Sequence, residues 1–140
     1  MNHALAMITF KFQNSSENAS KYPGVGNVTS IKLYNSDTST KEPIRSGGAT
    51  LNIATGAIAN AEPAADGITI TPTAQPLMDE TGADKLARML VYPSANFTAG
   101  EAKMEFVVDD VKYTLNVPAL ADQTDATKGY VAGNNYIYTL

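Results

Sequence analysis

The sequence ends with the stretch that decides its fold, Gly129-Tyr130-Val131-Ala132-Gly133-Asn134-Asn135-Tyr136-Ile137-Tyr138-Thr139-Leu140. A glycine-bearing turn leads into a run in which Tyr136 and Tyr138 alternate with Ile137 and Thr139. Alternation of aromatic and β-branched residues with period two predicts a strand with two distinct faces. We expect Tyr136 and Tyr138 to anchor this strand and Ile137 to lie in the core.

The sequence stops inside this predicted strand, at Leu140. A domain rarely ends on its most strand-like segment, because an end needs only enough polarity to fray into water. We therefore expect residues 1–140 to be a single β-sandwich domain from a longer protein. Met1 is expected to be an added start residue, so that any native targeting sequence has been removed.

Similar short alternating segments, separated by Gly, Pro, Asn and Asp, occur along the rest of the sequence. The predicted strands cover 4–12, 28–34, 47–54, 67–71, 102–108 and 111–117. A turn at Thr55-Gly56 is expected to fold the 47–54 segment back on itself. The pair across Asp109-Asp110 is the clearest hairpin, since Asp tolerates the left-handed turn conformation.

One segment leaves two interpretations open. Residues 84–90 have the length of a helical turn, with Thr81 near its cap, whereas the apolar run 89–92 before Pro93 is typical of a buried strand. We favour the strand. With no long amphipathic helix elsewhere, the sequence predicts an all-β fold, an antiparallel β-sandwich of about seven to nine short strands.

The core of such a sandwich is built from the inward faces of its strands. We expect it to contain Ile8, Phe10, Phe12, Ile31, Leu33, Leu90, Phe106, Val108, Leu115 and Ile137.

Composition narrows the class of protein. Charged residues make up only 17% of the chain while Thr and small residues are abundant, which suits an extracellular β-protein. The net charge of -4 and the scattering of ten basic residues argue against nucleic-acid binding. The absence of cysteine removes disulfides, thiol catalysis and thiolate metal sites.

No constellation of catalytic residues stands out, and we expect neither an enzyme nor a cofactor. His3, the only histidine, lies at the start of the chain, and the glycine pairs lack the features of a phosphate-binding loop. Three local acidic pairs lack the spacing that wraps a calcium ion and are interpreted as solvated turns: Asp109-Asp110, Asp122 with Asp125, and Asp79-Glu80.

Several tyrosines leave a carbohydrate-binding interpretation open, because exposed rings can stack on sugars. Packing in the core or at sheet edges is the more usual role of aromatics at strand spacing. The residues concerned are Tyr34, Tyr92, Tyr113, Tyr130, Tyr136 and Tyr138.

Four stretches, in order along nearly the whole chain, resemble fimbrillin-like proteins. They are the His-Ala-Leu-Ala start and alternating strand at 3–10, the strand at 28–33 with the later Thr55-Gly56 turn, the apolar run into proline at 89–93, and the Gly-x-x-Tyr-x-Tyr-Thr ending within 132–140. Each stretch is short, and the series carries the resemblance.

This resemblance implies a transthyretin-like β-sandwich, the second domain of a lipoprotein exported to the outer surface of Bacteroides-type bacteria. Such proteins are stalk, anchor or tip subunits of adhesive pili. Their subunits polymerise when a neighbour's strand fills a groove, so other pilus subunits are the expected partners. The alternative is a surface module of the same fold that binds glycans or host ligands without polymerising.

Overall fold

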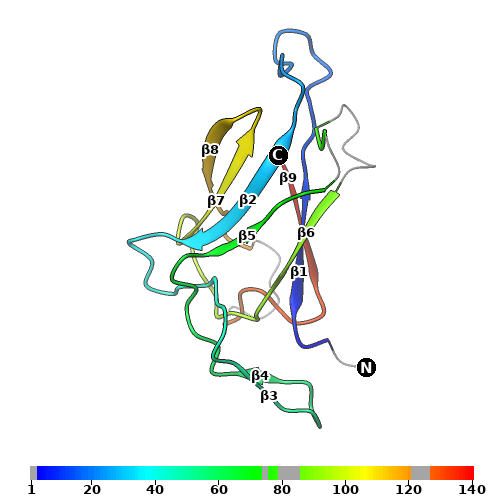
Figure 1. Ribbon diagram of the computed structural model, residues 1–140. Coiled ribbons are helices and arrows are strands. Elements are labelled where there is room, and N and C mark those ends of the chain that lie inside the picture. Colours follow the sequence, from blue (N-terminus) through cyan, green and yellow to red (C-terminus); the bar gives the residue numbers. More distant parts are fainter. Residues whose placement is uncertain (1–2, 74–75, 79–85, 121–126) are drawn as a thin grey trace.

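The computed structural model describes residues 3–73, 76–78, 86–120 and 127–140, and these form strands, turns and loops without a helix. Figure 1 shows the strands arranged as facing sheets with a small hairpin projecting below them. The fold is therefore an all-β sandwich, as predicted. Its strands are β1 (Ala6–Lys11), β2 (Val28–Asn35), β3 (Thr50–Leu51), β4 (Ile58–Ala59), β5 (Ile68–Ile70), β6 (Leu86–Val91), β7 (Ala102–Val108), β8 (Val111–Asn116) and β9 (Asn135–Thr139).

The first sheet has the order β6-β1-β9, with β1 in its centre. The ambiguous segment is a strand, β6, antiparallel to β1. β9, however, runs parallel to β1, so the expectation of a wholly antiparallel sandwich is wrong for this pair. More than 100 residues separate the two strands, and over that length no tight turn dictates their direction.

The second sheet has the order β5-β2-β7-β8 and is antiparallel throughout. Its β7–β8 hairpin turns at Asp109 and Asp110, whose φ angles are 46° and 65°. Two positive φ angles are the requirement of a two-residue type I′ turn, which matches the twist of the strands. The predicted hairpin is confirmed.

The core lies between these two sheets. It buries seven of the residues expected there: Ile8, Phe10, Phe12, Ile31, Leu33, Phe106 and Val108. Other apolar residues complete it, among them Val28, Ile44, Leu77, Met89, Val91, Phe97, Met104, Val117 and Tyr130.

Leu90 and Ile137 are corrections to the expected core, being 60% and 54% exposed. In β6, Met89 pairs with the buried Ile8, which places Leu90 beside Met7 on the outer face. In β9, Ile137 pairs with Thr9 on the same outer face. Both segments are strands as predicted, but each of these residues lies on the outward side.

Replacement of Phe10 by alanine should lower the free energy of unfolding by about 3–5 kcal/mol, because the ring is fully buried and stacks on Tyr138. Urea unfolding of F10A checks this value. Leu90→Ala is the matched control on the neighbouring strand and should change stability by less than about 1 kcal/mol. Equal losses in the two variants would contradict the assignment of inner and outer faces.

Candidate functional site

The inward face of strand β8 carries a row of apolar side chains that remain partly exposed to solvent. Its residues Val111, Tyr113 and Leu115 are 51%, 39% and 44% exposed. They stand opposite Val108, Phe106 and Met104 of β7, all of which are buried. Directly opposed residues of antiparallel strands share a face, so the β8 row belongs to the core side of the sheet. Leu115 therefore faces inward, but the expectation that it is buried is wrong.

The cause of this exposure is the unequal size of the two sheets. Four strands in one sheet face three in the other, and β8 and β9 are edge strands. Among the described residues no strand continues the smaller sheet beyond β9. We call the row Val111, Tyr113 and Leu115, together with the free edge of β9, the open flank.

A cavity of about 390 Å³ lies at the open flank. Leu115 of β8 and Leu140, next to the end of β9, both line it, so the two edges approach each other there. The remaining apolar lining comes from Phe12, Tyr22, Met78 and Phe106. The cavity can receive an apolar side chain from a strand lying beside β9.

The edge of β9 lacks the usual protection against pairing with another chain. Residues 129–140 contain no charged side chain, and the outward residues are Asn135, Ile137 and Thr139. Natural edge strands are commonly protected by Lys, Pro or a bulge. The main chain of β9 is thus able to pair with a further strand.

Buried tyrosine contacts hold β9 in place. The hydroxyl of Tyr136 accepts a hydrogen bond from the Val131 amide at 2.9 Å, and the hydroxyls of Tyr138 and Tyr130 are 3.0 Å apart. Burial raises the pKa of both Tyr130 and Tyr138, so both remain neutral at ordinary pH. Tyr136 and Tyr138 anchor the last strand, and Tyr130, one of the six tyrosines considered for sugar stacking, is fully buried and not available to a sugar.

The loop 14–27 supports one wall of the cavity through Asp109. The carboxylate of Asp109 accepts hydrogen bonds from the Gly26 amide (3.0 Å), the Tyr22 hydroxyl (2.7 Å) and the Asn27 amide (2.9 Å). These hydrogen bonds lower the pKa of Asp109, with the Gly26 amide contributing most, followed by Tyr22 and then Asn27. The hydrogen bond between Tyr22 and Asp109 raises the pKa of Tyr22 to about 12. Gly26 has a φ of 82°, and a Cβ there would lie 2.6 Å from the Cβ of Met78, so only glycine fits.

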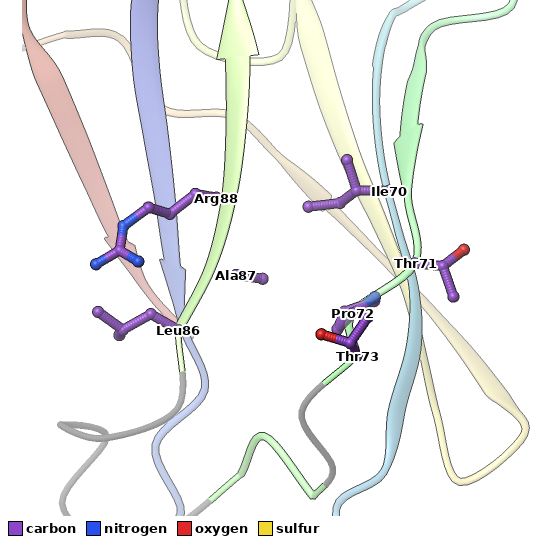
Figure 2. Close-up of a pocket in the computed structure, with 7 residues that line it drawn as sticks. All are labelled: Ile70, Thr71, Pro72, Thr73, Leu86, Ala87 and Arg88. Atoms are coloured by element: carbon purple, nitrogen blue, oxygen red, sulfur yellow. The ribbon is translucent and has the colours of Figure 1, made fainter.

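A second cleft, of about 410 Å³, separates the edge strands β5 and β6 on the other flank. Figure 2 shows Ile70 pointing across it toward β6, where Ala87 lies, while Arg88 extends away from Ile70. Its lining is Ile70, Thr71, Pro72, Thr73, Leu86, Ala87 and Arg88. Within the described part of its lining, this cleft has no uncovered row like that of β8.

The described residues contain no group of three or more metal-ligating side chains. His3 is exposed at the start of the described chain. Asp109 belongs to the turn network above, whereas Asp79, Glu80, Asp122 and Asp125 lie outside the described residues. Nor do those residues include a helix that is long and apolar enough to cross a membrane.

No protein-family model matches this sequence, and no curated protein matches it in a sequence search. The geometry of the open flank and the sequence itself are the features that point to a function.

Substitution of Asp109 by asparagine should remove part of the acid sensitivity of the fold. A carboxylate with a lowered pKa contributes stability above its unfolded pKa of about 3.9, and this contribution is lost as pH falls through the folded value. The urea midpoint of D109N should be lower than that of the wild type at neutral pH and should change less below about pH 4.

Asp110→Asn is the matched control, because it removes one charge from the same turn without touching these hydrogen bonds. Its acid dependence should follow the wild type. If D109N also follows the wild type, the carboxylate does not hold the loop.

Proposed function

We propose that this chain is a structural or adhesive subunit domain of a bacterial surface pilus, and that it assembles by β-strand addition between subunits. The uncovered row of β8 beside the free edge of β9 is the observation that carries this proposal. The resemblance to fimbrillin-like proteins supports the same function. On this proposal the domain acts at the bacterial cell surface, and its partners are other pilus subunits.

Strand addition at the open flank would supply two kinds of interaction at once. The main chain of an added strand pairs with β9, and its inward side chains cover Val111, Tyr113 and Leu115. Main-chain pairing gives affinity, and alternate side chains give register. Since these three residues are roughly half exposed, completing their burial contributes about 1 kcal/mol for each.

The walls of the open flank are ordered before any strand arrives. The Asp109 network holds the loop 14–27, and the hydroxyl of Tyr136 holds the turn before β9. An acceptor that is already ordered loses little conformational entropy on association. This property favours assembly over a role as a passive spacer.

The alternative, a glycan-binding surface module, receives less support from the geometry. A stacking platform needs several exposed rings on one face, whereas Tyr130 is buried and Tyr136 and Tyr138 turn toward the core. Among the tyrosines of the described residues, Tyr113 is the most exposed, and its ring stacks on Phe106 with centroids 5.8 Å apart.

Replacement of Leu115 by lysine should abolish assembly, because it places a charge in the apolar row. Its stability as a monomer should fall by only about 1 kcal/mol, since the side chain is already roughly half exposed. Light scattering after size-exclusion chromatography, over a range of concentrations, together with electron microscopy, checks for oligomers and filaments.

Thr114→Lys is the control, because it adds the same charge to the opposite face of the same strand. This variant should assemble like the wild type. A wild-type chain that stays monomeric at every concentration, or an L115K variant that assembles normally, would overturn strand addition at the open flank.

A further inference from the structure

Residues 46–61, here called the arm, project from the sandwich as a hairpin. The arm contains β3 and β4, and Figure 1 shows it extending below both large sheets. Its side chains Leu51 and Ile53 are 52% and 93% exposed. Such exposed apolar side chains contribute little to the stability of the sandwich and are accessible to another molecule.

The root of the arm is firmly attached to the sandwich. The side chain of Asn35 at the end of β2 both donates to the carbonyl of Ile44 and accepts from its amide, each at 2.8 Å. Arg45 Nη1 donates to the Ala61 carbonyl at 2.7 Å, and the Ser46 amide donates to the Glu62 carbonyl at 2.8 Å. Both strands of the arm thus leave the core in a defined direction.

The tip of the arm is also ordered by its own hydrogen bonds. The side-chain oxygen of Asn52 accepts from the amides of Ala54 and Thr55, at 3.0 and 3.2 Å. The Asn52 amide donates to the Ala57 carbonyl at 2.9 Å, which closes the hairpin. A two-stranded hairpin without a third strand is only marginally stable in water, so a further strand partner would stabilise it.

Charge distribution indicates what kind of partner the arm fits. Residues 46–61 contain no charged side chain, although Arg45 and Glu62 stand immediately at the root. A charged partner would form no ion pair with the arm. Edge strands that avoid pairing with other chains normally carry charged side chains, which the arm lacks. The open flank has the matching character, since residues 129–140 are also uncharged and the β8 row is apolar.

We infer that the arm of one copy binds the open flank of a second copy, where it extends the smaller sheet beside β9. This inference rests on the proposed function and names its strand donor. In this contact β3, with Leu51, lies beside β9, and Ile53, in the turn that follows β3, covers the apolar row of β8. The arm and the open flank are different surfaces, so the contact is head-to-tail and propagates into a filament.

Cross-linking between engineered cysteines tests this contact directly, because the native chain contains none. An Ile53→Cys chain carrying a small tag is mixed with an untagged Leu115→Cys chain and treated with a short bismaleimide. We expect the tagged–untagged dimer to dominate, with each variant alone remaining uncoupled. Thr38→Cys, at an exposed position outside the arm, replaces I53C as the control and should not couple to L115C.

A charge variant separates the failure of this inference from the failure of strand addition. Ile53→Lys should leave the melting temperature of the monomer unchanged and raise the concentration needed for assembly by about tenfold or more. Normal assembly of I53K, or coupling of I53C only to itself, would overturn the arm as donor while strand addition stands. Absence of assembly by the wild type would overturn both.

Discussion

The structure depends on an imbalance between its two sheets, four strands facing three. Burial is complete where strands oppose each other across the core, and β1, paired on both sides, is buried at Ile8 and Phe10. At β8 the same inward alternation meets no opposing strand among the described residues. Its apolar row stays in place because β7 pairs with it and because Tyr113 stacks on Phe106. The row is therefore exposed because the opposing sheet has one strand fewer, while the local conformation of β8 is that of an ordinary strand.

Two carboxylates near the second sheet hold the loops around it in place. Asp109 and Glu101 are both carboxylates that accept several main-chain hydrogen bonds. Donors from Thr98, Thr40 and Lys41 surround Glu101, and the Thr98 amide contributes most to lowering the pKa of Glu101 to about 2. Each carboxylate ties a long loop to a short turn. These two carboxylates thus fix loops around the second sheet.

Local patterns located the strands well, because alternation is a property of neighbouring residues. They could not decide which face of a strand points inward, and Leu90 shows why. The run Met89-Leu90-Val91 is apolar at every position, so only pairing with Ile8 places Met89 inside. For Ile137 the decision comes from hydrogen bonds of the tyrosine hydroxyls to the turn before β9. These contacts join β9 to the turn just before it, and the alternation within the strand alone does not show which face makes them.

The open flank was harder to anticipate, since it is defined by what lies across the core from β8. Leu115 was assigned to the correct face, yet burial requires a strand that the described chain does not place there. The arm and the open flank share one property that sequence does display, an absence of charge over 46–61 and 129–140. A net charge of -4 carried elsewhere keeps separate copies apart at long range, while two neutral surfaces meet without repulsion at contact. On the inferred contact between the arm and the open flank, placing charge outside both stretches favours a directed contact over general aggregation.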